Sequence, residues 1–245
     1  MTELPRLSIA EPVSELRKIR IRDNGEPLVD FLKLCPDLQM DRPRFTYRRE
    51  TVLRKTVAEK LCAANADLMS KGFRILVVEG WRAPHIQRRM YAAVWKQFAT
   101  RYPEKSHAAL TRLVNQFTAP MNLRVPPPHS TGAAIDVTLT DLEGNPLDVR
   151  SPYVEYDPAG FVFAAPNLTP EARKNRDTLA QAMVGAGITN YPSEYWHWSY
   201  GDQGWAYRGR HEHAIYKAIE PADWRAHPDD LGEHPLEFIE RKTEE

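Results

Sequence analysis

The sequence predicts an α+β protein, because its helical and strand-like patterns are grouped along the chain and do not alternate regularly. Apolar residues recur at steps of three or four over residues 53–68 and again over residues 86–98, which is typical of amphipathic helices. The run FRILVV at residues 73–78 is typical of a buried strand, and residues 133–140 alternate between apolar and polar side chains as a strand does. A regular alternation of strands and helices would instead favour a parallel doubly wound sheet.

The amount and balance of charge exclude some classes of partner. The chain has 245 residues, of which 33 are Lys or Arg and 33 are Asp or Glu, and 42% are apolar. This length can bury a full core, and we expect a single domain over residues 1–245. Because the charges balance, no overall field favours nucleic acid or a membrane surface as a partner. The oligomeric state is left open.

The N-terminus and the cysteines predict a cytoplasmic protein. Residues 1–20 lack a basic start followed by an apolar core, so no secretory signal is expected. No apolar run approaches the roughly 18 residues of a membrane span. Cys35 and Cys62 are too few for a disulfide scaffold, and we expect both to be free, reduced thiols.

The elements expected in the first part of the chain begin with an irregular segment. Prolines interrupt residues 1–50 repeatedly, so we expect loops and short strands that wrap the core. A helix is expected from Thr51 to a stop at Gly72, and the strand FRILVV follows it. Gly80 and Pro84 then bracket a turn at the end of this strand.

The middle of the chain combines two helices with the alternating strand. The helix of residues 86–98 is followed by a short helix after Ser106. A proline-rich loop at residues 118–128 leads into the strand of residues 133–140. The turn LEGNP, at residues 142–146, is expected to lead to another strand.

The last part of the chain contains one long helix and one aromatic strand. Thr169, followed by Pro-Glu, is a typical helix start, and Gly185 is a typical end. The aromatic residues 195–200 are expected to form a strand. Residues from about 217 to 245 are polar, and we expect a peripheral tail.

Residues 129–136, HSTGAAID, place an imidazole and a carboxylate on either side of a glycine. Gly132 lets the chain bend at the start of the strand, so His129 and Asp136 can converge on one ion. Asp136 lies on the polar face of its strand and therefore faces a cleft or water. Imidazole and carboxylate together suit zinc. The alternative is a capped turn before an ordinary strand.

Glu194 and His197 lie three residues apart in the aromatic segment EYWHW. His197 could be a third zinc ligand, and Glu194 could take a proton from water at the metal. The alternative is an aromatic core strand with a surface glutamate.

Arg82, in GWRAP, lies at the exit of the first strand. A guanidinium at a strand end can stabilise an oxyanion. On its own, this motif could equally be a surface arginine before a helix.

Taken together in this order, the segments VEGWRAP, HSTGAAIDVTL and SEYWHW make the sequence resemble the D-alanyl-D-alanine dipeptidases and their carboxypeptidase relatives. The segment NRDTLAQAMVGAGI also resembles a helix of that family, and the resemblance covers roughly residues 50–205. It implies the fold shared with the hedgehog signalling domain, in which a small antiparallel sheet carries the zinc site and is flanked by helices.

The resemblance also implies roles for five residues. His129, Asp136 and His197 match the ligands of one Zn²⁺ ion, Glu194 matches the general base, and Arg82 matches an arginine that stabilises the transition state. The implied enzyme is a zinc metallopeptidase that hydrolyses a short peptide, above all a D-Ala-D-Ala-type dipeptide, with zinc-activated water.

The sequence departs from the family pattern at two positions that concern the substrate. Pro127 stands where the family commonly has a serine for the substrate carboxylate, and Val154 stands where dipeptidases have an acid for the substrate amino group. Glu155 or Asp157 could replace this acid after a small shift. The metal chemistry is therefore predicted more firmly than dipeptide specificity.

Two alternative functions remain. A D,D- or L,D-carboxypeptidase would act on longer cell-wall peptides, but the lack of a signal peptide disfavours it. A zinc-stabilised binding module without activity would not need Glu194 and Arg82, and both are present.

Overall fold

The structure is a computed structural model, and it describes residues 11–115, 118–121, 124–154, 157–221, 223–232 and 234–239. The α-helices are α1 Val13–Leu16, α2 Phe31–Leu34, α3 Lys55–Met69, α4 Pro84–Arg101, α5 His107–Val114, α6 Pro170–Gly185 and α7 Gln203–Gly209. Short 3₁₀ helices are η1 Pro128–Thr131, η2 Pro158–Gly160 and η3 Pro228–Asp230. The strands are β1 Arg20–Ile21, β2 Leu28–Asp30, β3 Gln39–Met40, β4 Val52–Arg54, β5 Phe73–Glu79, β6 Ala134–Asp141, β7 Thr189–Asn190, β8 His197–Ser199 and β9 His213–Ala214.

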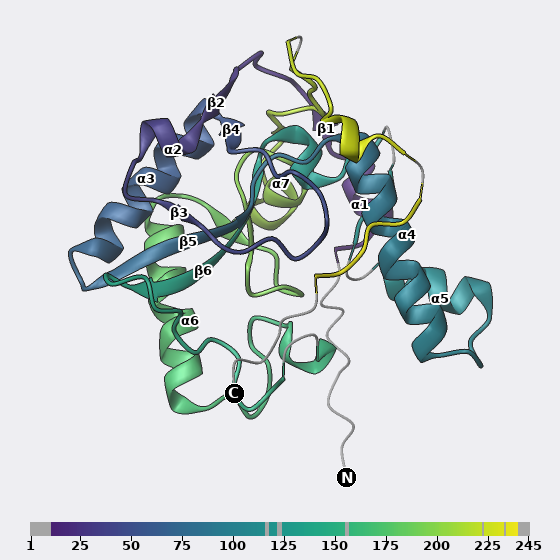
Figure 1. The fold of residues 1–245 in the computed structure, drawn as a ribbon. Helices are drawn as coiled ribbons and strands as arrows, with labels where there is room; N and C mark the ends of the chain where they lie inside the picture. The colour runs from purple at the N-terminus through teal and green to yellow at the C-terminus, as the bar shows by residue number, and fades with distance from the viewer. Residues whose placement is uncertain are drawn as a thin grey trace.

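A five-stranded sheet with the order β3-β5-β6-β8-β7 forms the centre of the fold (Figure 1). Only β3 and β5 pair in parallel, and the other three pairs are antiparallel. Two further sheets have two strands each, β1 with β9 and β2 with β4. Helices flank this mainly antiparallel sheet, which confirms the predicted α+β class.

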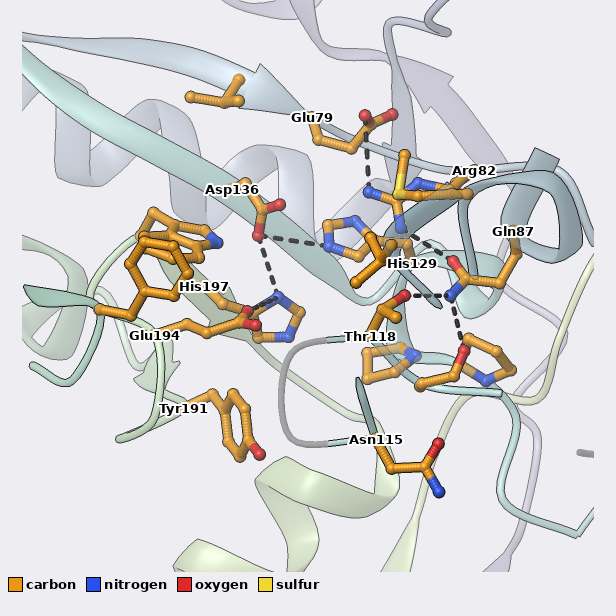
Figure 2. A pocket seen from close by; sticks show the side chains of 18 of the residues that line it. Glu79, Arg82, Gln87, Asn115, Thr118, His129, Asp136, Tyr191, Glu194 and His197 are labelled. Atoms are coloured by element: carbon orange, nitrogen blue, oxygen red, sulfur yellow. Dashed lines mark hydrogen bonds and ion pairs between the residues drawn. The ribbon is translucent and has the colours of Figure 1, made fainter. Parts of the chain in front are cut away.

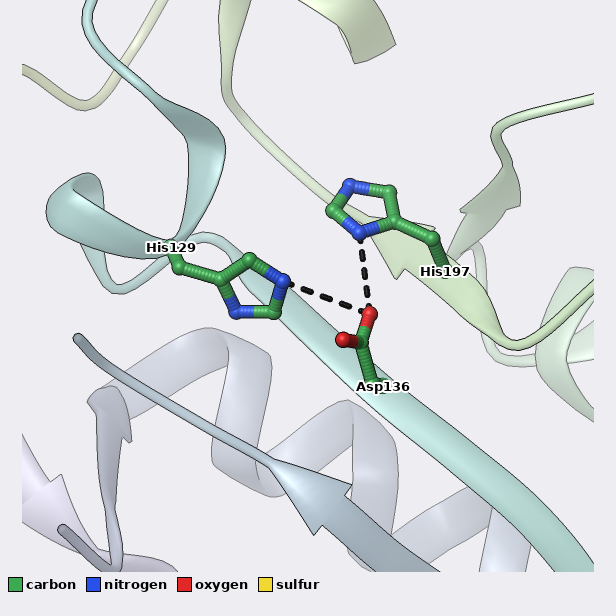
Figure 3. Close-up of side chains that lie close together, drawn as sticks. All are labelled: His129, Asp136 and His197. Carbon is green, nitrogen blue, oxygen red and sulfur yellow. Dashed lines mark hydrogen bonds and ion pairs between the residues drawn. The ribbon is translucent and has the colours of Figure 1, made fainter. Parts of the chain in front are cut away.

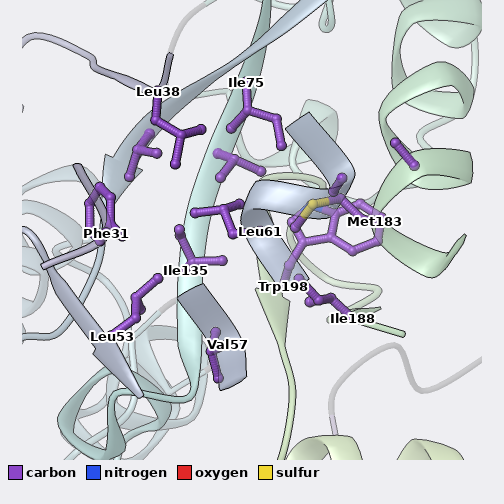
Figure 4. Close-up of a cluster of buried hydrophobic side chains, with 14 of the residues drawn as sticks. Phe31, Leu38, Leu53, Val57, Leu61, Ile75, Ile135, Met183, Ile188 and Trp198 are labelled. Atoms are coloured by element: carbon purple, nitrogen blue, oxygen red, sulfur yellow. The ribbon is translucent and has the colours of Figure 1, made fainter. Parts of the chain in front are cut away.

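The main hydrophobic core lies between the sheet and the helices α3 and α6 (Figure 4). The predicted stripe of α3 is buried, since Val57, Leu61 and Leu68 are fully inaccessible to solvent. The side chain of Thr169 accepts a hydrogen bond from the backbone N–H of Ala172 at 3.1 Å and so caps the start of α6, as predicted.

The helices α4 and α5 pack against each other on the other side of the molecule (Figure 1). Pro84 occupies the first turn of α4, and Ile86 and Met90 are buried on its inner face. Ser106 caps α5, as its position predicted. Both helices therefore lie where the 3.6-residue periodicity placed them.

Two expectations are wrong in detail. Residues 52–54 belong to β4 and pair with β2, so the first long helix starts at Lys55 and not at Thr51. In the described residues between 147 and 169 no strand follows the LEGNP turn, which makes only an isolated bridge between Thr140 and Pro146. Pro146 cannot donate a backbone hydrogen bond, which limits strand pairing at that point.

The polar tail is better packed than its composition predicted. Leu236 is 3% exposed and lies in a cluster with Trp81, Ile86 and Met90. Phe238 pairs with Phe45, with ring centroids 4.3 Å apart. A few apolar residues thus hold the described part of the tail against the body, although most of its residues are polar.

Candidate active site

The register of the central sheet brings three polar side chains into one row. Asp136 on β6 is paired with Glu79 on β5 and with His197 on β8. Residues that are paired directly across neighbouring strands point to the same face of the sheet. The fold therefore places Glu79, Asp136 and His197 side by side, although they come from separate parts of the sequence.

His129 reaches this row from η1, just before β6. Gly132 ends η1 in the left-handed conformation with φ of 71°, and a Cβ atom there would lie 2.4 Å from Leu28. Glycine suits this position because residues with a side chain rarely adopt a left-handed φ. The turn directs the His129 ring back towards Asp136, as Figure 3 shows.

The ligand atoms of His129, Asp136 and His197 converge on one point. His129 Nε2 lies 3.3 Å and His197 Nδ1 lies 2.9 Å from the same Asp136 Oδ1 (Figure 3). The ligand atoms of the three side chains all lie within 4.8 Å of one another, and all three residues are buried. Burial would raise the pKa of Asp136, but the two imidazoles, His129 above all, hold this pKa well below its usual range.

The hydrogen bonding of His129 shows that this point suits a cation. His129 Nδ1 lies 2.8 Å from the carbonyl oxygen of Gly80, which can only accept, so Nδ1 carries the proton. In a neutral ring Nε2 is then an acceptor, and it faces a carboxylate oxygen. Two acceptors at this distance repel unless a proton or a metal ion lies between them.

The donor set fits zinc in particular. Two imidazoles and one carboxylate are common zinc ligands, and ligand atoms of a tetrahedral ion stand about 3.3 Å apart. The Gly80 carbonyl fixes the tautomer of His129, which is the usual support for a metal-bound histidine.

Glu194 lies in the turn before β8, beside the ligand cluster. Its backbone N–H donates to the carbonyl of Tyr191 at 2.9 Å, and its Oε2 lies 3.9 Å from His197 Nδ1. The side chain is buried, which together with the negative charge of Asp136 raises the pKa of Glu194 well above its usual value. A carboxylate with a raised pKa can accept and return a proton near neutral pH.

Arg82 is buried and firmly held (Figure 2). Its Nη1 donates to Gln87 Oε1 at 2.8 Å, and its Nη2 lies 3.5 Å from Glu79 Oε2. Its backbone N–H donates to the His129 carbonyl at 3.2 Å. Burial would lower the pKa of Arg82, but the charge of Glu79 raises it above its ordinary value, so Arg82 stays charged.

Three residues that support Arg82 were missed by the sequence analysis. Glu79 binds Arg82 and also accepts a hydrogen bond from the hydroxyl of Tyr47. Gln87 accepts a hydrogen bond from Arg82, and its own Nε2 donates to the carbonyl of Ala119 at 2.7 Å. The acid in VEGWRAP was a signal that could have revealed Glu79, whereas Tyr47 lies in an irregular segment without a recognisable pattern.

The predicted substrate residues are less well placed. Asp157 lines the cavity, and one of its carboxylate oxygens accepts a hydrogen bond from the N–H of Ala159 at 3.0 Å. Glu155 lies outside the described residues. Val154 is 74% exposed at the cavity edge, and Pro127 lines the cavity without a side-chain donor.

The cluster opens into a cavity of about 330 Å³. Arg82, His129, Glu194 and His197 line it together, so they face one common space. The apolar side chains of Met90 and others on α4 extend its wall away from the cluster.

The chain is similar to known proteins over most of its length. The sequence profile of the family described as D-ala-D-ala dipeptidase matches residues 35–217. The chain belongs to this family. It is therefore a peptidase by family, and the resemblance seen in the three motifs is confirmed.

Two similar proteins are both named D-alanyl-D-alanine dipeptidase. The chain is 29% identical to the one from Synechocystis sp. over 241 residues, which cover 87% of this chain and 97% of that protein. It is 32% identical to the one from Escherichia coli (strain K12) over 180 residues, which cover 69% of this chain and 82% of that protein.

Two solved structures have a partial likeness to this fold. One is the LD-carboxypeptidase LdcB, with a TM-score of 0.37, 18% identity and coverage of 74% of this chain and 71% of that one. The other is a mutant of the D,D-pentapeptidase VanY from a VanB-type resistance cassette in complex with Zn(II), with a TM-score of 0.38, 12% identity and coverage of 65% and 79%.

Two further expectations from the sequence concern the cysteines and membrane-spanning helices. Cys35 and Cys62 are both free, as predicted. Among the described residues, no helix is long and apolar enough to cross a bilayer.

Proposed function

We propose that this chain is a zinc-dependent dipeptidase that hydrolyses D-Ala-D-Ala-type dipeptides. The observation that carries the proposal is the convergence of His129, Asp136 and His197, with Glu194 only 3.9 Å from His197. The names of the two similar dipeptidases support the substrate class.

One zinc ion would be held by His129, Asp136 and His197. When bound, it would supply a Lewis acid that lowers the pKa of water and polarises a carbonyl oxygen. Three protein ligands leave a further position for water or substrate, which is typical of catalytic rather than structural zinc sites.

Glu194 acts as the general base. It takes a proton from the attacking water and later returns it to the amine that leaves. Its burial and its raised pKa support this double role, because the carboxylate accepts a proton readily and holds it until the C–N bond breaks.

Arg82 stabilises the negative charge that develops on the carbonyl oxygen of the substrate. Its contacts with Glu79 and Gln87 fix the guanidinium before the substrate arrives, so little reorganisation is needed during the reaction. Asp157 is our candidate for binding the substrate's amino group, since it lines the same cavity and carries a carboxylate.

The first test separates the base from the metal ligands. Glu194→Gln should keep its zinc and lose about 10²- to 10⁴-fold in kcat, because a general base contributes about that much. Elemental analysis and turnover of D-Ala-D-Ala measure the two properties, and Glu143→Gln, at an exposed position, is the control. Full activity in Glu194→Gln would contradict the role given to Glu194.

His197→Ala should behave differently and lose the metal itself. Zinc content after dialysis gives the answer, and the exposed His107→Ala is the matched control. If His197→Ala retained one equivalent of zinc, His197 would not be a ligand.

The choice of substrate is tested with the same dipeptide in two forms. A dipeptidase should hydrolyse free D-Ala-D-Ala and reject the N-acylated form, whereas a carboxypeptidase for longer peptides should prefer the acylated form. The zinc-loaded wild type should also be screened on L,D- and L,L-dipeptides. Inactivity on every peptide would instead support a binding module without activity.

A further inference from the structure

Arg44 lies in the loop between β3 and β4, and it lines the cavity of the candidate active site. Its Nε is buried, and no side chain or backbone group of the described residues accepts a hydrogen bond from it. Burying a charged donor without a partner is costly unless a ligand completes the site. Among the described residues no group supplies this partner, so the Nε of Arg44 is left for a ligand that carries an acceptor.

The backbone at Arg44 is held in place, while its side chain has no hydrogen-bond partner among the described residues. The carbonyl of Arg44 accepts a hydrogen bond from the N–H of Ile239 at 3.0 Å. The next residue, Phe45, packs on Phe238 with ring centroids 4.3 Å apart. The loop is thus fixed by the C-terminal segment, and an anchored loop presents a guanidinium to a ligand at low entropic cost.

Arg44 lies within electrostatic reach of the proposed base. Burial and Asp136 raise the pKa of Glu194, whereas the positive charges of Arg82 and Arg44 lower it. Arg82 is already bound by Glu79 and Gln87. Of these two arginines, Arg82 has partners for both of its Nη atoms, whereas no hydrogen bond or ion pair links the Arg44 side chain to any described residue.

Other arginines that line the cavity are engaged elsewhere, and Arg150 among them has an interaction partner. Arg49 donates to the backbone carbonyls of Val78 and Asp41. Arg208 binds Glu11, and Arg101, at the last residue of α4, packs over the ring of Tyr102.

We propose that Arg44 binds the C-terminal carboxylate of the substrate. The inference rests on the proposed peptidase function and specifies how the same site recognises its substrate. It also accounts for Pro127, which occupies a position in the cavity wall but offers no donor to a carboxylate.

The chemistry of the reaction explains why the carboxylate would lie near Arg44. Glu194 must approach the nitrogen of the leaving residue to return its proton, and only two covalent bonds, N–Cα and Cα–C, separate this nitrogen from the carboxylate carbon. The carboxylate therefore comes close to two other negative groups, Glu194 and Asp136. A guanidinium offsets this repulsion and can bind both carboxylate oxygens at once.

The test compares a free carboxylate with its amide. The zinc-loaded wild type and its variants Arg44→Ala, Arg44→Lys and Arg42→Ala are assayed on the best dipeptide substrate and on the same dipeptide with a C-terminal amide. Arg42 is exposed, lies two residues away and does not line the cavity, so it controls for the loss of one positive charge. Zinc content and melting temperature show whether each variant is folded and loaded.

We expect amidation to reduce kcat/KM of the wild type and of Arg42→Ala about 10- to 100-fold, as loss of a charged hydrogen bond would. Arg44→Ala should hydrolyse the free dipeptide about 10- to 100-fold less efficiently, mainly through KM, and amidation should then cost it less than about threefold. Arg44→Lys should recover part of the preference for the free acid, because it keeps the charge but loses the planar fork.

Two results would overturn the inference and leave the proposed function intact. The wild type could hydrolyse the amide as efficiently as the acid, or Arg44→Ala could keep the full preference for the acid. If the wild type hydrolysed no peptide at all, the proposed function would be wrong, and the inference that rests on it would fail with it.

Discussion

Asp136 shows how a single residue depends on its neighbours in this protein. It is buried on β6, and burial alone would favour the protonated form of its carboxyl group. The imidazoles of His129 and His197 reverse this effect and keep the carboxylate charged. For Glu194, burial and the charge of Asp136 outweigh the nearby cations Arg82 and Arg44, and its pKa is raised. The two acids are therefore suited to different tasks, one to hold a cation and the other to carry a proton.

A prediction at this scale concerns Glu79. Glu79→Gln keeps the shape of the side chain but removes the charge that holds Arg82. We expect kcat to fall about 10-fold or more with little change in KM, because Arg82 would contribute only in the transition state. Arg82 would also stay buried after losing its ion pair with Glu79, and breaking a buried ion pair typically costs about 3–5 kcal/mol of stability. Steady-state kinetics and urea unfolding measure the two effects.

The exposed Glu59→Gln on α3 is the control for this experiment. A Glu79→Gln enzyme that is less stable but keeps its kcat would show that Glu79 serves folding only. An increase in KM alone would indicate a role in substrate binding.

At the scale of elements, α4 joins the site to the rest of the fold. Its first turn provides Gln87, which holds Arg82, and its inner face packs on the tail through Ile86 and Met90. The tail in turn fixes the loop that carries Arg44, through the bond from Ile239 to the carbonyl of that residue. A segment that looks peripheral in the sequence thus supports two arginines of the site.

Leu236→Ala tests whether the tail folds together with the body. Leu236 is 3% exposed among Trp81, Ile86 and Met90, so its truncation should cost about 2–5 kcal/mol of unfolding free energy. Leu231→Ala, at a residue that is 62% exposed, should change it by less than about 0.5 kcal/mol. Urea denaturation measures both. Equal, small effects would mean that the tail detaches before the core unfolds.

At the scale of the whole molecule, the site connects parts of the chain that are far apart in sequence. η1, β6 and β8 contribute the proposed ligands, and β5 contributes Glu79. Because these elements meet only in the folded state, an ion at this point would bind the folded chain and not the unfolded one. Metal binding and folding are then thermodynamically linked.

Removal of zinc should therefore lower the melting temperature. A free zinc concentration 100-fold above Kd stabilises a folded protein by about 2.7 kcal/mol. Thermal unfolding of the wild type with zinc and with a chelator measures the shift, and His197→Ala should show none. A wild-type melting temperature that does not respond to zinc would argue against a metal at this cluster.

Local patterns in the sequence determined the positions of most long helices and strands and the identity of the proposed metal ligands. The period of 3.6 residues located α3 and α4, and the period of 2 residues located β6. The apolar run FRILVV located β5, and the start and stop signals at Thr169 and Gly185 located α6. The motifs HSTGAAID and SEYWHW selected the residues that the structure brings together. Boundaries such as the start of α3 were missed, since the pairing of β4 with β2 overrides local helical preference.

Only the tertiary structure decided how the side chains of the candidate site come together. The row of Glu79, Asp136 and His197 depends on strand register, and Asp136 and His197 are 61 positions apart. The position of the Arg44 guanidinium depends on a loop that the distant tail holds in place. Such contacts depend on how the whole chain packs, and no pattern within a short stretch of sequence encodes them.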